Sequence, residues 1–389
     1  MLIFIFLFPS SSKFAESTFF SIKKDKGRKL NSKLVNLKPN IWIKVNEFKK
    51  TDWYRQEHAG AIYDSRRGTI LIFGSDTHGL DWDNEIHEFN PVEEKWSRHY
   101  RRARKESYRA DEDGMAVSGY DRLLPWAMHT FDNIVYDPKL DSFWVTAIPA
   151  HNPMRLKINE VKIHPTWIYD LKSREWKIFR NKGVPPPNFF ASASAYDSDR
   201  ETIIAYKKGG VWEIGPDRDE WKHATDESHH EIHFTMEYDT KNKKLAVFGD
   251  YHRTNAVWVY NPGSKAGSKG KWEKKIPLGD LCPEDQHFPV AFDVDNGVFL
   301  LVPDNWQYEK DKNGKVRAIS PKDSSTFVYN LATNSYYKLP NADMKPLGMN
   351  YMMVYDQYHK AFLLITGNHG EPTIVWALKL DLKALDLRR

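Results

Sequence analysis

The chain alternates between hydrophobic runs and short polar turns in a pattern that recurs six times. Each unit opens with small or apolar residues that end in an aromatic–aspartate pair, as in "AGAIYD" at 59–64. A short polar turn follows, and then a very hydrophobic run such as "TILIFG", "TIIAY" or "AFLLITG". Short apolar runs bounded by turn residues are typical of buried strands, so each unit is predicted to begin with a β-hairpin.

The aromatic–aspartate pair marks the same point of every unit. The pairs are Tyr63–Asp64, Tyr136–Asp137, Tyr196–Asp197, Tyr238–Asp239, Phe292–Asp293 and Tyr355–Asp356. A third apolar run follows in each unit, and in four units a tryptophan then opens a fourth run: Trp96, Trp176, Trp221 and Trp272. The sixth unit has no fourth run, but "NIWIKVNEF" at 40–48 has that pattern and precedes the first unit.

This arrangement predicts an all-β fold, a β-propeller of four-stranded blades closed by the N-terminal strand. Such closure removes the sheet edges that would otherwise be exposed. The chain resembles the kelch-type propellers over nearly all of 40–389, although their double glycine is absent. We expect six blades, or seven if the loop 100–127 holds further strands. The expected organisation is a leader and linker over 1–38 and one propeller domain over 39–389.

Composition narrows the class of protein and its partners. The chain has 389 residues, of which 14% are aromatic, and its net charge is +5. Because 57 basic residues face 52 acidic ones, with one short basic run at 99–109, nucleic acid is not an expected partner. The N-terminal "MLIFIFLF" is too short to span a bilayer and resembles a secretory signal without its usual positive start. We therefore expect a secreted or periplasmic monomer without a membrane span.

Histidines gather at one end of the predicted inner strands. Counting back five residues from each aromatic–aspartate pair gives His58, Phe131, Ala191, His233, His287 and Asn350. His129 lies two residues before Phe131 and keeps the same side of the strand. The second strands return to this end, where they carry His78, His151, His252 and His369. Eight of the 15 histidines thus fall in two narrow windows, which predicts a functional site there.

The residue types allow two kinds of chemistry at that site. His233, His252, Cys282 and His287 could together bind a structural zinc ion, since zinc prefers nitrogen and sulfur ligands. The alternative for Cys282 is an inert buried cysteine. His129 and His151, with Trp126 as an aromatic face, could instead neutralise a carboxylate and transfer a proton.

A narrower resemblance extends this second reading. The runs "HAGAIYDSRRGTILIFGSDTHG", "WDNEIHEF", "PWAMHTFDNIVYDP" and "HPTWIYDL" are similar to the secreted propeller lyases that cleave ulvan. The resemblance covers mainly the first two units. It implies a zinc ion and β-elimination next to a uronic acid in an acidic polysaccharide. It also implies catalytic roles for His129 and His151 with a tyrosine and an arginine, for which Tyr251 and Arg253 are the candidates. His58, His78, Trp126 and Asn350 are the candidate substrate-binding residues.

The third unit departs from that pattern. Phe189–Phe190 stands where a tyrosine is expected, and Tyr206–Lys207 stands in place of an arginine. Because phenylalanine cannot transfer a proton, the alternative is a non-catalytic kelch-type propeller that binds carbohydrate or protein. The basic run 99–109, with Tyr100 and Tyr108, is a candidate wall of a groove for an anionic chain.

Overall fold

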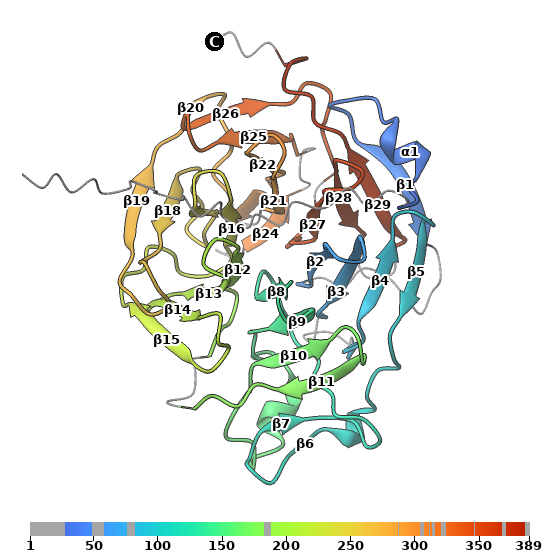
Figure 1. Cartoon of the computed structure of the whole chain (residues 1–389), viewed down its shortest axis with the longest axis vertical. Coiled ribbons are helices and arrows are strands. Elements are labelled where there is room, and N and C mark those ends of the chain that lie inside the picture. The colour runs from blue at the N-terminus through green and yellow to red at the C-terminus, as the bar shows by residue number, and fades with distance from the viewer. Residues whose placement is uncertain are drawn as a thin grey trace, which may run out of the picture.

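The protein is a six-bladed β-propeller (Figure 1), and it has no seventh blade within the residues described. The computed structural model describes residues 28–48, 58–75, 82–182, 188–286, 288–303, 312, 324–345, 347–367 and 371–385, and the backbone of 307–310 and 316–319. In these residues no helix has the length and apolar character needed to cross a membrane.

Each blade is an antiparallel sheet of four strands. Blade one contains β2 (Gly60–Asp64), β3 (Thr69–Phe73), β4 (His87–Asn90) and β5 (Lys95–Arg98). Blade two contains β8 (Ile134–Asp137), β9 (Ser142–Val145), β10 (Trp167–Asp170) and β11 (Glu175–Ile178). Blade three contains β12 (Ala193–Asp197), β13 (Thr202–Lys207), β14 (Gly210–Ile214) and β15 (Trp221–Thr225).

The other half of the ring repeats this order. Blade four contains β16 (Thr235–Asp239), β17 (Lys244–Phe248), β18 (Val257–Asn261) and β19 (Lys271–Lys275). Blade five contains β21 (Val290–Asp293), β22 (Val298–Leu301), β25 (Phe327–Asn330) and β26 (Ser335–Lys338), with a short extra strand, β20 (Leu278–Gly279), parallel to β26. Blade six contains β27 (Met353–Asp356), β28 (Ala361–Thr366), β29 (Thr373–Leu378) and β1 (Ile43–Phe48).

The predicted closure by the N-terminal strand is confirmed. β1 pairs antiparallel with β29, from Ile43 opposite Ala377 to Phe48 opposite Thr373. The inner strands β2, β8, β12, β16, β21 and β27 each contact the next one, and β27 contacts β2 again. The ring therefore has no open edge between its first and last blades.

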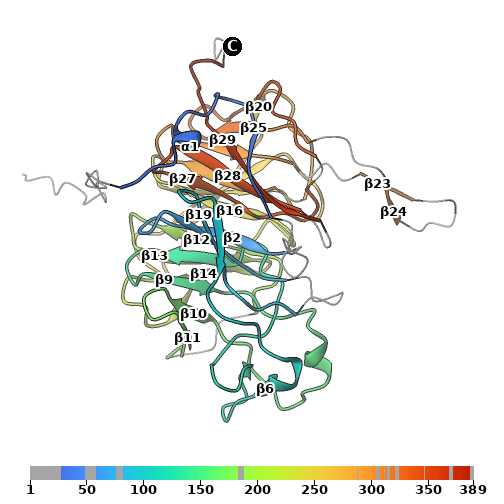
Figure 2. The same ribbon diagram turned by 90° about the vertical axis from the view of Figure 1, so that its right-hand side faces the viewer.

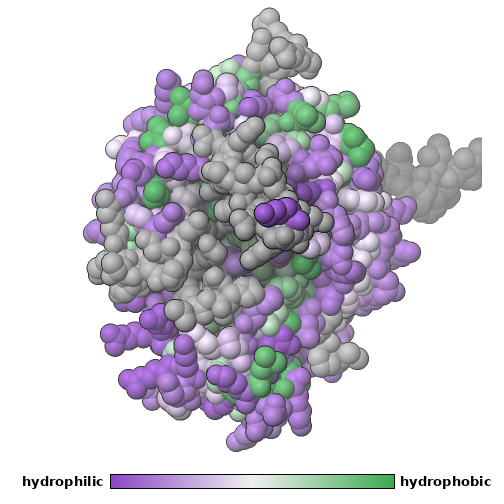
Figure 3. Space-filling model, turned by 180° about the vertical axis from the view of Figure 1, so that it is seen from behind, coloured by the Kyte–Doolittle hydropathy of each residue, from purple (hydrophilic) through white to green (hydrophobic). Residues whose placement is uncertain are grey.

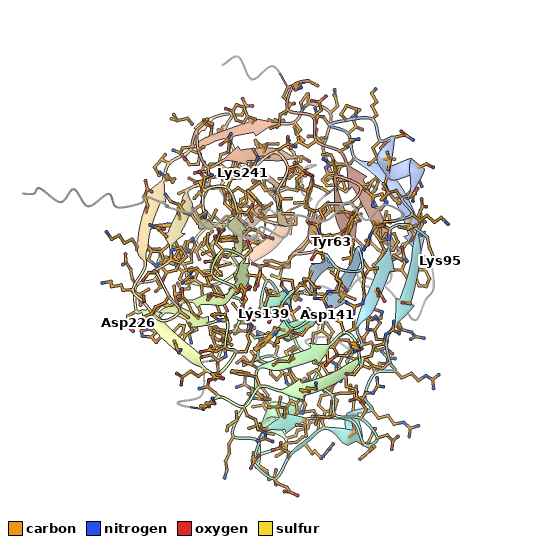
Figure 4. All side chains as sticks on the ribbon, in the orientation of Figure 1. Tyr63, Lys95, Lys139, Asp141, Asp226 and Lys241 are labelled. Atoms are coloured by element: carbon orange, nitrogen blue, oxygen red, sulfur yellow. The ribbon has the colours of Figure 1, made fainter. Side chains whose placement is uncertain are left out.

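The aromatic–aspartate pairs lie where the inner strands end, and we call that side the tyrosine face. Asp64 Oδ1 accepts hydrogen bonds from the backbone N–H groups of Arg66 and Arg67, at 2.9 and 3.0 Å. Such aspartate turns are a common way to close a tight hairpin. The Tyr63 hydroxyl donates to Asp356 of blade six at 2.6 Å. Figure 4 labels four residues of these strand ends and turns: Tyr63, Lys139, Asp141 and Lys241.

The long loop after blade one forms an appendage and not a seventh blade. It holds a short helix, η1 (Lys105–Ser107), and the hairpin β6 (Arg109–Ala110) and β7 (Ala116–Val117), at the bottom of Figure 1. A second short helix, η2 (Pro153–Leu156), belongs to the loop of blade two. The backbone N–H of Ala116 donates to the carbonyl of Ile163 at 2.9 Å, so the two long loops pack on each other.

The expected leader and linker over 1–38 is wrong for its last residues, 28–38. The helix α1 (Ser32–Val35) packs against blades one and six, and Leu34 is 0% exposed. The backbone N–H of Asn31 donates to His359 Nε2 at 3.0 Å. Burial of Leu34 and Leu37 in the core makes residues 28–38 part of the propeller; residues 1–27, including the signal-like run, lie outside the described residues.

A second hairpin leaves the disc from the opposite side to the tyrosine face. It consists of β23 (Gln307–Lys310) and β24 (Val316–Ile319), and Figure 2, which shows the disc from its edge, has it projecting to the right. This side, where the inner strands begin, is the histidine face.

Candidate functional site

The start of the inner strands has the same unusual backbone in four blades. His58, Phe131, Ala191 and His233 have φ values of 63°, 49°, 48° and 63°, in the left-handed region. A residue with a side chain pays on the order of 1 kcal/mol for this conformation. Backbone hydrogen bonds between blades hold it, from Phe131 N–H to the His58 carbonyl at 2.8 Å and from His233 N–H to the Ala191 carbonyl at 2.6 Å. Strain of this kind often accumulates at functional sites.

Three predicted histidines lie in a row on the histidine face. The ring of His58 stacks on that of His129 with centroids 4.2 Å apart and an interplanar angle of 7°. His129 in turn contacts His151, with centroids 5.1 Å apart. His58 and His129 are buried, at 6% and 2% exposure, whereas His151 is exposed. In this imidazole row only His151 is open to a ligand.

Phe131 joins the imidazole row to blade four. Its ring lies 5.4 Å from the rings of both His58 and His129 and 5.3 Å from that of His233. It also contacts Phe190 at 5.5 Å, and Phe190 contacts His151 at 5.0 Å. The histidines of blades one, two and four, far apart in sequence, therefore surround one aromatic centre.

Phe190 also lines a surface pocket of about 480 Å³, which we call the Phe190 pocket. Tyr251, which is 54% exposed, lines it together with Lys207 and Lys208. The Lys207 ammonium donates to the carbonyl oxygen of Asn188 at 3.1 Å, and partial burial lowers the pKa of Lys207. The pocket thus combines a phenol with two ammonium groups, which suits an anionic, hydroxyl-rich ligand.

A carboxylate already occupies part of this pocket. Glu231 forms ion pairs with Lys208 and with His252, the latter at 2.8 Å. These two partners lower the pKa of Glu231. Since Glu231 neutralises Lys208 and also hydrogen-bonds His252, an incoming acidic group would meet mainly Lys207.

The tyrosine and phenylalanine of blade three have different surroundings from those of Tyr251. Tyr206 is 0% exposed, and its oxygen accepts hydrogen bonds from the backbone N–H groups of His229 and His230 at 2.7 and 3.1 Å. Burial raises the pKa of Tyr206. Phe189 is a core residue at 1% exposure, and only Phe190 belongs to the site. Tyr251 is therefore the available phenol among these residues.

Two residues predicted to bind substrate are placed in the interior. Trp126 is 0% exposed, and its indole N–H donates to the Val117 carbonyl at 2.8 Å within the appendage core. Asn350 is also 0% exposed; its amide donates to the Ile365 carbonyl and accepts from Met352 N–H, at 2.9 and 2.7 Å. Neither can contact a ligand in this structure, so both predictions are wrong. The same holds for His58, which is buried in the imidazole row at 6% exposure.

The predicted zinc ligands do not come together among the residues described. His252 is on the surface and bound to Glu231, whereas Cys282 is 2% exposed in an apolar cluster with Phe248 and Tyr336. Burial raises the pKa of Cys282, which disfavours the thiolate that zinc requires. His233, His252 and Cys282 form no group of shared ligands in this part of the chain. They do not fit the zinc ion that the resemblance implies.

A different group of three ligands was missed from the sequence. One atom each from Asp83, Glu85 and His87 lies within 4.8 Å of the others, and all three residues are buried. Their spacing in "DNEIH" puts them on one side of an extended segment, which is a readable pattern. His87 Nε2 already bonds Asp83 Oδ2 at 2.8 Å, and Arg98 lies 3.5 Å from Glu85. The group offers a metal-ligand set, and its existing bonds also hold the start of β4.

The remaining candidates are placed as follows. His78 and His287 lie outside the described residues. Arg253 follows Tyr251, which lines the Phe190 pocket, by two positions in the sequence. Its φ is 54°, and its backbone N–H donates to the Asp250 carbonyl. Figure 3 shows the side turned away in Figure 1; its described surface is mainly hydrophilic, with hydrophobic side chains in small groups.

The sequence has no match in two sets of known proteins. No protein-family profile matches the chain, and no curated protein matches its sequence.

Proposed function

We propose that the histidine face binds an acidic, uronate-containing polysaccharide such as ulvan and cleaves it by β-elimination, as a secreted kelch-type propeller lyase. One observation carries the proposal: an exposed imidazole, His151, contacts Phe190, and Phe190 lines one pocket together with an exposed phenol, Tyr251. Histidine and tyrosine are both able to transfer protons in such reactions. The left-handed backbone at the start of four inner strands supports a functional role for this face.

The proposed reaction uses residues that a ligand can contact. Lys207 neutralises the uronate carboxylate, which makes the neighbouring C5 proton more acidic. His151 removes that proton, the electron pair forms the C4–C5 double bond, and the C4–O bond breaks. Tyr251 gives its proton to the leaving oxygen. His129, buried against His151, is a positioning residue, because it is 2% exposed.

The test follows the ultraviolet absorbance of the unsaturated uronate while the protein is mixed with ulvan and other uronate polysaccharides. His151→Ala and Tyr251→Phe should each lower the rate by roughly 10²–10⁴-fold, the usual contribution of general acid–base catalysis. His223→Ala, at a partly exposed histidine on the outer strand of blade three, is the matched control and should leave the rate unchanged. Equal rates in all variants would contradict the assignment.

A second candidate function is a non-catalytic propeller that binds acidic glycans. The pairing of Glu231 with Lys208 and His252 favours it, because a site built to hold a substrate carboxylate already contains one. Retained glycan binding without any rise in absorbance would establish this function. Glu231→Gln should then strengthen binding, since it removes a negative charge and releases the Lys208 ammonium.

A further inference from the structure

A second cavity lies away from the histidine face. It occupies the central channel, has a volume of about 820 Å³, and reaches the turns of the tyrosine face at Ser65, Pro138 and Ser198. At the other end the buried rings of Phe131 and Tyr351 pack edge to face, with centroids 5.6 Å apart. Asp132, the residue after Phe131, lines the cavity. The cavity therefore opens on the tyrosine face, opposite the imidazole row, and aromatic rings lie at its other end.

One wall residue breaks the sixfold pattern of this pocket. The residue before each aromatic–aspartate pair lines the cavity in every blade: Ile62, Val135, Ala195, Glu237, Ala291 and Val354. Five are apolar and buried, whereas blade four has the half-buried Glu237. A carboxyl group in an apolar wall costs free energy unless something compensates it. Its presence at this one position calls for a partner.

A second carboxyl group lies beside the first. Asp132 of blade two accepts a hydrogen bond from the backbone N–H of Met236, the residue before Glu237, at 2.8 Å. Burial raises the pKa of Glu237 to about 8, and burial and then the charge of Glu237 raise the pKa of Asp132. In the empty pocket both groups therefore hold protons more strongly than carboxyl groups in water.

The other ionisable groups around the pocket do not supply that partner. The hydroxyls of Tyr63, Tyr238 and Tyr355 donate to aspartates of neighbouring blades, at 2.6–2.7 Å. Burial raises the pKa values of the lining tyrosines Tyr63, Tyr136, Tyr196, Tyr238 and Tyr355, so they stay neutral. At the rim Arg28 lies over the ring of Tyr358 and donates to the carbonyls of Arg66 and Arg67, while Arg66 pairs with Asp141. Both arginines are held at the mouth.

We infer that the channel binds a small organic cation with an apolar body, with Glu237 as its counter-ion and Asp132 beside it. The aliphatic wall accommodates the apolar body, and the aromatic rings around the channel favour a cation over a neutral group. A metal ion fits less well, because calcium and magnesium need a shell of oxygen ligands that this apolar wall does not offer. A large pocket with few polar groups of shifted pKa is typical of a small-molecule site.

The test is calorimetric titration with benzyltrimethylammonium, whose charge does not change with pH. Its affinity should rise at least about tenfold from about pH 6 to about pH 9, as Glu237 loses its proton. Benzyl alcohol and benzoate, which have the same ring without the positive charge, should bind at least about tenfold more weakly at the higher pH.

Substitutions of Glu237 test whether the probe binds in the channel. Glu237→Gln should weaken binding at least about tenfold and remove its pH dependence, whereas Glu237→Asp, which keeps the charge, should retain the pH dependence. Glu273→Gln, on the outer strand of the same blade, should bind as the unchanged protein does. No binding of the ammonium probe, equal binding of benzyl alcohol, or unchanged binding in Glu237→Gln would each overturn the inference.

Discussion

The two faces of the propeller use their polar residues in opposite ways. On the tyrosine face the same arrangement occurs in all six blades: the aspartate of every aromatic–aspartate pair accepts backbone N–H groups of the following turn. On the histidine face the equivalent positions hold His58, Phe131, Ala191, His233, His287 and Asn350, and they are not alike. A group that every blade repeats serves the fold, since each blade must close the same hairpin. A group that one blade alone carries needs another explanation.

The comparison applies within the channel as well. Its wall repeats an apolar residue in five blades and departs from it at Glu237. The aspartates a short distance away at the tyrosine face are also carboxylates, yet backbone hydrogen bonds compensate them. Glu237 hydrogen-bonds the backbone of Tyr238, whereas each repeated aspartate accepts both backbone and side-chain hydrogen bonds. Stability measurements can detect that difference.

Removal of a repeated aspartate should have the largest effect. Asp137 is 0% exposed and binds the guanidinium of Arg218 through two contacts of 2.7 and 3.0 Å. Asp137→Ala leaves Arg218 buried without its partner and should lower the free energy of unfolding by about 3–5 kcal/mol. Denaturant unfolding measures this value. His151→Ala on the histidine face is the comparison, and should change it by less than about 0.5 kcal/mol; similar losses in the two variants would contradict the distinction.

Removal of the Glu237 carboxyl group in the channel should change the free energy of unfolding in the opposite direction. Folding raises the pKa of Glu237 from 4.5 to about 8, so the folded chain keeps a proton that the unfolded chain loses. This group therefore stabilises fully below about pH 4.5, and its contribution is lost as the pH rises towards 8. The full pKa difference corresponds to roughly 5 kcal/mol, and water reaches the half-buried side chain and weakens the effect. At about pH 9, Glu237→Gln should therefore be more stable than the unchanged protein by roughly 3 kcal/mol, and the difference should shrink towards about pH 5. A stability difference between the two proteins that stays constant from about pH 5 to about pH 9 would contradict this prediction.

The sequence was sufficient for the regular part of the molecule. The repeat of apolar runs, the turn residues and the aromatic–aspartate pairs predicted the blades and the closure by β1. They could do so because the blades and the closure depend on contacts within one blade or between neighbouring blades. Trp126 and Asn350 were misassigned because their burial depends on the appendage and on blade six, which no local pattern reports. The predicted ligands His233, His252 and Cys282 lie apart for the same reason, since Cys282 faces the core between blades four and five.

The channel pocket could have been found from the sequence in part. Alignment of the six aromatic–aspartate pairs shows Glu237 as the one charged residue at its position. Asp132 is likewise the one charged residue at its own position, four before each pair, but its contact with Met236 of blade four depends on the curvature of the ring. The left-handed residues at the histidine face were equally hidden, since histidine, phenylalanine and alanine do not favour that conformation.

An effect of intermediate size is expected from two tyrosines of neighbouring blades. One should matter for stability and the other for the elimination rate. Tyr206→Phe leaves two buried backbone N–H groups without their acceptor and should cost about 1–3 kcal/mol of unfolding free energy. Tyr251→Phe removes an exposed hydroxyl and should change stability by less than about 0.5 kcal/mol. Under the proposed function the effect on the elimination rate is reversed, so each variant is the control for the other. A strong rate loss in Tyr206→Phe, at unchanged stability, would move the catalytic phenol to blade three.

The smallest expected effect concerns the charge on the loop 99–109. Arg101, Arg102 and Arg104 are exposed there, and Arg102 is fixed through its backbone N–H to Glu85 at 2.8 Å. Substitution of all three by alanine should weaken binding of an acidic glycan a few-fold at low salt and leave it unchanged near 0.5 M salt, since exposed charges act over about a Debye length. The matched control replaces Lys139, Lys241 and Lys360 on the tyrosine face, which removes the same charge from the other side of the disc. If both triple variants bind equally weakly, the glycan responds to net charge alone; if only the loop variant is affected, the loop forms a wall of the binding surface on the histidine face.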